Sequence, residues 1–452
     1  MKNIIAIVGR PNVGKSTLFN RLTSSNEAIV HDSSGVTRDR NYGEGEWTGK
    51  KFFLIDTGGF VPHSDDKFEE AIRAQVKMAI EEADKILFVV DSKLGLHPLD
   101  KEVANMLRKY ANDKQIILCS NKIDDIKQEN LVADFYSLGL GEPFPISAIS
   151  GRNSGDLLDI VCKDIEEDDT DTDERIKFAV IGRPNAGKSS IVNALLNEER
   201  NIVTDIPGTT RDTIDSVVKY HNEDIVLIDT AGLRKKTKIS EDVEFYSTVR
   251  TYKAIQRCDV AILVIDVSII IENLETSSDY KLATFKLDKQ DTVIIEEVYK
   301  YKKGLLVVIN KWDLIEKDSN TAKIIEQKIK EHLQSYDFLK FIFISAKTKQ
   351  RIHKILEDGR KIYELRNSEI KTSELNEKLL PEIQKSPPAS LRGKEIKINY
   401  ITQVKTSPPV FAFFTNDDKG VQPNYKKFLE RKIRSFWDFD GVPISLIFKK
   451  KN

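Results

Sequence analysis

The most constraining feature of this 452-residue sequence is a glycine-containing segment that occurs twice. Residues 9–17 read GRPNVGKST and residues 182–190 read GRPNAGKSS; each follows a short apolar run and precedes a stretch with helical apolar spacing. In such a strand–loop–helix unit, inward-turned backbone N–H groups and the helix N-terminus bind a polyphosphate. Two copies in the same context make chance negligible, so the sequence predicts two phosphate-binding loops.

Each loop residue type has an expected task. The lysine is expected to contact the terminal phosphates, and the serine after it to ligate Mg²⁺. The residues assigned to the loops are Gly9, Asn12, Gly14, Lys15, Ser16 and Thr17 in the first copy, and Gly182, Asn185, Gly187, Lys188, Ser189 and Ser190 in the second.

The repeat extends beyond these loops. Residues 35–39 recur as 208–212, and the DxxG segment at 56–59 recurs at 229–232, both with the same offset of 173 residues as the loops. A tandem duplication explains this most simply.

Apolar runs of strand length alternate with helical stretches in both copies. This pattern predicts an α/β fold, a doubly wound and mostly parallel sheet in each half, with ligands at the carboxyl ends of the strands. All motifs fall at those ends. The runs are 4–8, 52–55, 86–90 and 116–119, then 178–181, 225–228, 260–265 and 305–309.

Each half also carries a motif suited to reading a base. Asp124 and Asp313 end an NKxD segment, and their carboxylates can accept hydrogen bonds from guanine N1–H and the 2-amino group, whereas adenine offers neither donor. Guanine is therefore predicted. The base-binding residues are Asn121, Lys122, Asp124, Ser147 and Ala148, and in the second copy Asn310, Lys311, Asp313, Ser345 and Ala346.

Length and composition allow about three domains. Three cysteines without CxxC spacing indicate buried reduced thiols, and no stretch approaches the length of a membrane span, so we expect a soluble, cytoplasmic protein, with no membrane partner and as a monomer. The acidic run at 166–174 predicts an extended linker.

The last 82 residues differ from both copies. Residues 371–452 hold 16 Lys and Arg against 9 Asp and Glu, a net charge of +7. Helical stretches at 373–384 and 425–436 and strand-like runs at 396–400, 410–414 and 444–448 predict a small α+β module. Such a charge surplus serves either ordinary solubility or contact with RNA or the ribosome, and the interleaved aromatic residues favour the second.

This order of motifs resembles the Der (EngA) family of ribosome-assembly GTPases over essentially the whole chain. Residues 397–403, 408–411 and 441–444 look like the KH-like domain of that family, which lacks the GxxG loop of ordinary KH domains, as does this module. The resemblance implies GTPase domains at 1–165 and 175–370, a KH-like domain at 371–452, and binding to the large ribosomal subunit or its precursor through ribosomal RNA.

The resemblance also implies roles at matching positions. Phosphate and Mg²⁺ would be handled by Lys15, Ser16, Thr37 and Asp56 in one site and by Lys188, Ser189, Thr210 and Asp229 in the other, with Gly59 and Gly232 completing DxxG. The lysines and threonines would be catalytic. Two features depart from the pattern: the segment from Asp266 to Asn310 is 14 residues longer than its counterpart, and residues 347–351 lack glycines that the first copy has.

The reaction predicted is attack of water on the γ-phosphate of GTP, stabilised by the lysine, Mg²⁺ and loop N–H groups. Ras-like enzymes orient the water with a glutamine after DxxG, but Phe60 and Leu233 stand there, so slow intrinsic turnover is expected. Asn12 and Asn185 could ligate K⁺ beside the phosphates; the resemblance adds that potassium-stimulated GTPases carry asparagine there. Alternatively, these asparagines only hold the loop's shape.

Two other functions remain open. One is a GTP-gated binding module in which a single site, the second in preference to the first, binds nucleotide without useful hydrolysis. The other is a tRNA-modifying GTPase, which would be expected to carry one GTPase domain and a C-terminal cysteine, whereas the last cysteine here is Cys258.

Overall fold

The computed structural model describes residues 3–23, 41–57, 76–77, 79–80, 83–111, 114–165, 173–196, 215–221, 223–230, 248–271, 287–315, 320–333, 336, 338–389, 395–417 and 419–450. The chain separates into two compact units, Met1–Glu174 and Arg175–Asn452. Residues 166–172 of the expected linker and residues 272–286 of the longer second-copy segment lie outside the described residues.

The first unit is built on a six-stranded sheet of order β2-β3-β1-β4-β5-β6. Its strands are β1 (Ile4–Val8), β2 (Asn41–Trp47), β3 (Lys50–Asp56), β4 (Lys85–Asp91), β5 (Gln115–Asn121) and β6 (Phe144–Pro145). Only β2, which pairs with β3, runs antiparallel. The apolar runs in this half all form strands of the sheet, and the mostly parallel arrangement predicted from them is confirmed.

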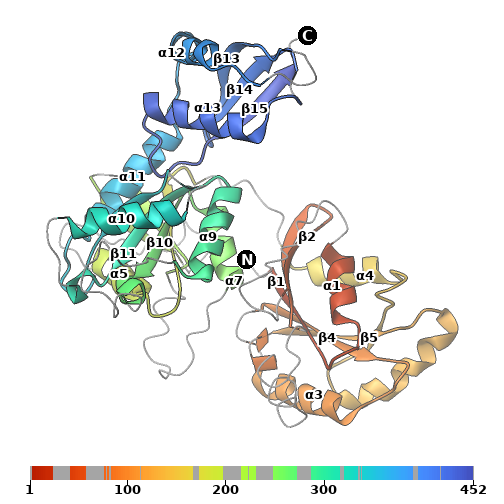
Figure 1. Ribbon diagram of the computed structural model, residues 1–452. Coiled ribbons are helices and arrows are strands. Elements are labelled where there is room, and N and C mark those ends of the chain that lie inside the picture. Colours follow the sequence, from red (N-terminus) through yellow and green to blue (C-terminus); the bar gives the residue numbers. More distant parts are fainter. Residues whose placement is uncertain are drawn as a thin grey trace. The chain divides into compact units, whose positions relative to one another are not determined.

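Helices cover both faces of this sheet (Figure 1). They are α1 (Lys15–Thr23), α3 (Pro98–Tyr110) and α4 (Ser154–Cys162), with a 3₁₀ segment η2 (Ile126–Leu138). α1 and α4 lie together on one side, where Leu18, Phe19 and Leu157 join the core formed by inward side chains of β1, β3, β4 and β5. The carboxyl ends of the strands, where the motifs lie, are therefore supported by a continuous apolar core.

The second unit repeats this sheet and adds a smaller one. The large sheet has the order β12-β11-β10-β7-β9-β8, which matches the first sheet strand for strand. Its elements are β7 (Ile176–Ile181), α5 (Lys188–Leu196), β8 (Ser216–Tyr220), β9 (Glu223–Ile228), α7 (Thr248–Arg257), β10 (Val260–Asp266), α8 (Val267–Ile271), α9 (Lys289–Lys300), β11 (Gly304–Asn310), η4 (Trp312–Leu314), α10 (Thr321–His332), β12 (Lys340–Phe343) and α11 (Lys354–Arg366).

The small sheet belongs to the basic C-terminal module. It comprises β13 (Ile398–Lys405), β14 (Val410–Thr415) and β15 (Ser445–Lys450), with β13 antiparallel and β15 parallel to β14. Helices α12 (Thr372–Lys385) and α13 (Pro423–Phe436) pack their apolar residues against it. The α+β module predicted from the sequence is confirmed element by element.

This module shares one continuous apolar core with the second large sheet. The core runs from Phe178 and Val264 through Ile362 to Phe411 and Phe439. Backbone bonds reinforce the junction: Leu305 N–H donates to the Gly441 carbonyl (2.7 Å), and Gly441 N–H donates to the Phe338 carbonyl (2.6 Å). The second large sheet and the C-terminal module therefore form one packed unit.

Two sequence expectations about class can be compared with the structure directly. All three cysteines are free and buried, and burial raises the pKa of Cys119 and Cys258 to about 12. Among the described residues, no helix is both long and apolar enough to cross a membrane.

Candidate functional site

The first phosphate loop connects β1 to α1. The Lys15 ammonium is buried, with 5% of the residue exposed, and donates to the carbonyls of Gly9 (2.8 Å) and Arg10 (2.9 Å). Ser16 Oγ donates to Oδ2 of Asp56 (2.6 Å), which stands at the carboxyl end of β3. These two oxygens provide the hard ligands that Mg²⁺ prefers, so the residues present fit that ion.

One amide joins this loop to the base-reading segment. Asn121 Nδ2 donates to the Val13 carbonyl (2.7 Å), and its Oδ1 accepts from Ala148 N–H (2.9 Å). The close approach explains Gly14, which has φ +97° and whose Cβ, if present, would lie 2.3 Å from Asn121 Nδ2. Glycine is required there because both the backbone conformation and the space exclude a side chain.

Asp124, whose carboxylate is expected to read the base, lies near the phosphate loop and lines the same cavity as Asn12 and Lys15. Asp124 accepts at Oδ1 from Ser147 Oγ (2.6 Å) and at Oδ2 from the Lys93 ammonium (2.7 Å), and its side chain is 44% exposed. These bonds from Lys93 and Ser147 lower the pKa of Asp124. The group is thus an ionised acceptor, as reading two guanine donors requires.

The cavity bounded by both segments has a volume of about 450 Å³, within the range of small-ligand sites. Lys122 supports its wall by donating to the Asn12 carbonyl (2.9 Å) and to Asp91 Oδ2 (2.6 Å). Phosphate-loop and base-loop residues therefore line one space of nucleotide size.

The second site repeats these contacts. Asn310 Nδ2 donates to the Ala186 carbonyl (2.9 Å) and its Oδ1 accepts from Ala346 N–H (3.0 Å), while Ser345 Oγ donates to Asp313 Oδ1 (2.6 Å). Three further features of the first site recur: Lys188 Nζ donates to the Arg183 carbonyl (2.6 Å), Lys311 Nζ donates to Asp266 Oδ2 (2.5 Å), and Gly187 has φ +93°.

The missing glycines of the second base loop do not change its path. Ser345 bridges Gln350 as Ser147 bridges Arg152. Lys349 (φ +58°) replaces Gly151 (φ +82°) in the left-handed region, at a cost of about 1–2 kcal/mol for a residue with a Cβ. The turn is kept at the expense of local strain.

The carboxyl end of β9 does differ from that of β3. Asp229 adopts φ +58°, its N–H donates to Asp215 Oδ1 (2.9 Å), and burial raises the pKa of its carboxyl group. Within the described part of the chain, no hydrogen bond joins Ser189 to Asp229. Ser189 and Asp229, which are expected to hold Mg²⁺ in the second copy, are therefore not arranged like Ser16 and Asp56.

A buried ion pair behind each phosphate loop was not predicted. Arg10 pairs with Asp100 of α3 (3.4 Å), and Arg183 pairs with Asp291 of α9 (3.1 Å). Burial raises the pKa of Asp291 to about 7 against the opposing effect of Arg183. The arginines recur at the 173-residue offset, but the aspartates are 191 residues apart, so the repeat could not reveal them.

Several assigned residues cannot be placed. Thr37, Gly59 and Phe60 of the first site and Thr210, Gly232 and Leu233 of the second lie outside the described residues.

Burial of Lys15 predicts a proton uptake on nucleotide binding. Burial lowers the pKa of Lys15 to about 8, so at pH 8.5 about three quarters of the free protein carries it neutral. Phosphate charges raise that pKa, so binding should take up about 0.75 proton at pH 8.5 and almost none at pH 7. Affinity should accordingly fall as the pH rises above about 8.

Calorimetric titration with GDP in two buffers of different ionisation enthalpy measures this uptake. The Asp313→Asn chain is suitable, because there GDP is expected to bind only the first site. Equal heats in both buffers at pH 8.5 would show that Lys15 stays protonated in the free protein.

Comparisons with known proteins agree with this geometry. A family model described as 50S ribosome-binding GTPase matches residues 4–122 and 177–311, and one described as the KH-domain-like C-terminal domain of EngA bacterial GTPase enzymes matches 369–449. Proteins named GTPase Der from Bacteroides fragilis and Cytophaga hutchinsonii are 50% and 49% identical, covering 100% of both chains.

A solved structure of Era with MgGDPNP and nucleotides 1506–1542 of 16S ribosomal RNA is 25% identical, covering 53% of this chain and 82% of that chain with a TM-score of 0.30. The full-length matches at about half identity, together with both family models, identify the protein's class. The chain belongs to the Der (EngA) family of GTP-binding GTPases.

Proposed function

We propose that this GTPase is a switch protein that acts in the assembly of the large ribosomal subunit, as a cytoplasmic monomer. The observation that carries the proposed binding of nucleotide is a pair of side-chain amide hydrogen bonds present in both halves. Asn121 in the first half and Asn310 in the second each connect a phosphate loop to a base loop in this way. The match to a 50S ribosome-binding family and the +7 charge of residues 371–452 support the ribosomal part.

In this proposal the reaction is in-line attack of water on the γ-phosphorus of GTP. A bond forms from the water oxygen to phosphorus, the bond to the β–γ bridging oxygen breaks, and GDP and inorganic phosphate leave with release of a proton of the attacking water. Lys15 or Lys188 and the loop N–H groups stabilise the charge on the transferred group. Ser16, Thr37 and Asp56, and in the second site Ser189, Thr210 and Asp229, would hold Mg²⁺, which would supply positive charge to offset that of the phosphates.

Slow intrinsic turnover and stimulation by K⁺ belong to the same proposal. Phe60 and Leu233 cannot orient water by a side-chain hydrogen bond, so another group must supply the missing charge. Asn12, which lines the first cavity, and its counterpart Asn185 are the side chains proposed to ligate K⁺.

A second candidate is that only one site hydrolyses GTP. The different arrangement at Asp229 favours this for the second site, because its carboxylate is not bonded to Ser189 as Asp56 is bonded to Ser16. Separate turnover rates for the two sites distinguish the candidates.

Co-sedimentation with purified ribosomal subunits tests the proposed function. The full-length chain should pellet with the large subunit in a non-hydrolysable GTP analogue and much less in GDP. If about six phosphates are neutralised, affinity should fall on the order of 10³-fold between 50 and 200 mM salt. Equal pelleting with both nucleotides, or preference for the small subunit, would contradict the proposal.

A further inference from the structure

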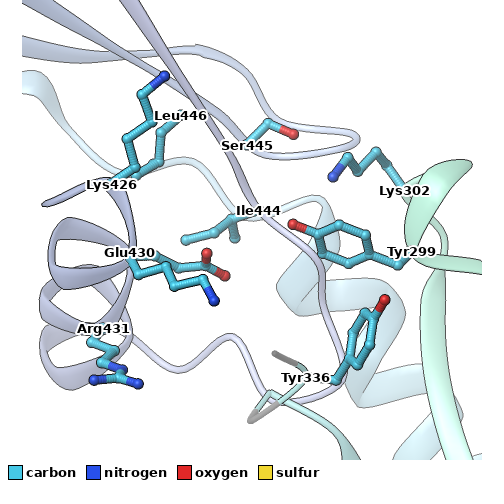
Figure 2. A pocket seen from close by; sticks show the side chains of 10 residues that line it. Tyr299, Lys302, Tyr336, Lys426, Glu430, Arg431, Ile444, Ser445 and Leu446 are labelled. Atoms are coloured by element: carbon cyan, nitrogen blue, oxygen red, sulfur yellow. The ribbon is translucent and has the colours of Figure 1, made fainter. Parts of the chain in front are cut away.

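A second cavity lies within Arg175–Asn452, between the large sheet's helices and the C-terminal module (Figure 2). Its volume is about 380 Å³, in the range of small-ligand sites. Tyr299, Lys302 and Tyr336 form one side, and α13 with the first residues of β15 forms the other.

The lining is strongly positive. Lys426, Lys427 and Arg431 share one side of α13 and face the cavity together with Lys302. Glu430 is the single acidic lining residue, and its Oε1 accepts from Arg434 (2.9 and 3.3 Å), which offsets its charge. An anion entering the cavity therefore meets four basic lining residues and one carboxylate, which is paired with Arg434.

The uncharged polar groups are hydrogen-bond donors suited to the same ligand. Figure 2 shows the hydroxyl group of Tyr299 directed toward the space between the two walls, and that of Tyr336 directed along its own wall toward Tyr299. Burial raises the pKa of both tyrosines, so both hydroxyls stay protonated. No residue that the structure describes forms a hydrogen bond with either hydroxyl.

The Tyr299 ring already contacts other side chains, and this determines which kind of ligand group the cavity suits. The Lys302 ammonium lies 3.7 Å from the Tyr299 ring centroid, and Tyr336 meets the same ring edge-on at 5.5 Å. Phe338 packs 6.0 Å from it. Because the Tyr299 ring is engaged, the cavity is suited to a phosphate group held by ammonium and hydroxyl donors rather than to a stacked base.

We propose that this cavity binds a backbone phosphate of an RNA strand. Lys426 and Lys427 are exposed at its rim, and β15, which begins in the cavity wall at Ser445, ends in exposed Lys449 and Lys450. These lysines continue the positive surface past the cavity, as a chain of phosphates requires and a free phosphate does not. The inference rests on the proposed function in assuming an RNA partner.

The test measures binding of a labelled 20-nucleotide single-stranded oligouridine to the full-length chain by fluorescence anisotropy. GDP and Mg²⁺ are kept saturating so that the nucleotide state of the second site is the same in every measurement. This control is needed because helix α9 connects the two places: it carries Asp291 beside the phosphate loop and Tyr299 in the cavity. Tyr299→Phe keeps the ring and the charge and removes one donor, so it should weaken binding about tenfold.

A matched pair of charge variants separates the cavity from general attraction. Lys302→Gln and Lys405→Gln each remove one positive charge, and Lys405 is an exposed lysine of β13 outside the cavity lining. Lys302→Gln should weaken RNA binding at least fivefold more than Lys405→Gln. Equal effects of the two, or unchanged binding by Tyr299→Phe, would overturn the inference.

Two further outcomes locate any failure. If inorganic phosphate or pyrophosphate displaces the RNA at micromolar concentration and Tyr299→Phe weakens that displacement, the ligand is a free phosphate compound and the RNA assignment is wrong. If the variants lose RNA affinity while the wild-type chain fails to pellet with ribosomal subunits, the cavity assignment stands and the proposed function falls.

Discussion

GTP hydrolysis at the first site is expected to be about 10³-fold faster in KCl than in NaCl at equal ionic strength, if K⁺ takes the part of an arginine finger. The physical reason is that an oxygen cage sized for K⁺ fits the smaller Na⁺ poorly. The Asp313→Asn chain isolates the first site, because its second site is expected not to bind GTP.

Two variants separate K⁺ ligation from loop shape. Asn12 has φ +63°, a left-handed conformation that asparagine tolerates and glycine adopts freely. Asn12→Gly therefore keeps the backbone path and removes the side-chain carbonyl. If Asn12 ligates K⁺, Asn12→Gly should abolish the KCl response while leaving GDP binding largely intact.

The opposite result has a distinct pattern. If Asn12 only shapes the loop, Asn12→Gly should keep the response, and only Asn12→Ala, which strains the left-handed backbone, should reduce activity. Equal wild-type rates in KCl and NaCl would refute the potassium mechanism.

The second large effect concerns base choice. Asp124→Asn should weaken GTP binding at the first site by about 10⁴-fold, because a neutral amide cannot accept from both guanine donors and leaves one of them unpaired. Xanthosine triphosphate should bind instead, since its 2-oxo group matches the new amide donor. Fluorescent-nucleotide titration of the full-length chain measures both affinities.

Ser147→Ala is the control for this substitution. It removes the 2.6 Å bond to Asp124 Oδ1 but leaves the carboxylate and its Lys93 contact. It should weaken GTP modestly and should not favour the xanthine nucleotide. Unchanged GTP affinity in Asp124→Asn would show that this motif does not read the base.

Much of the fold could be predicted because both periodicity and repetition were visible. The strands β1, β3, β4 and β5 are continuous apolar runs, and their counterparts recur in the second half. β2 escaped prediction because its residues 41–47 read NYGEGEW, with glycines where a side chain would meet the core. A Cβ at Gly43 would lie 2.5 Å from the Thr23 side chain and one at Gly45 2.4 Å from Phe52.

Within the two sites as well, some residues could be predicted from the sequence and others could not. Residues with one standard task, such as Lys15 and Asp124, could be assigned from motif spacing. Lys93, which contacts Asp124, could not, since the second copy has Ser268 at the corresponding position. The ion pairs of Arg10 and Arg183 could not be predicted from the repeat either. Their aspartate partners lie on α3 and α9, and the longer second-copy segment changes the sequence offset between these two helices.

The measurement that tests the central claim most directly is the number of guanine nucleotides bound per intact chain. Two sites built with the same amide bridge predict that equilibrium dialysis finds two GDP per wild-type chain, and one GDP with one XDP in Asp313→Asn. A wild-type chain that binds only one GDP, or an Asp313→Asn chain that still binds two, would contradict the account of two complete guanine sites.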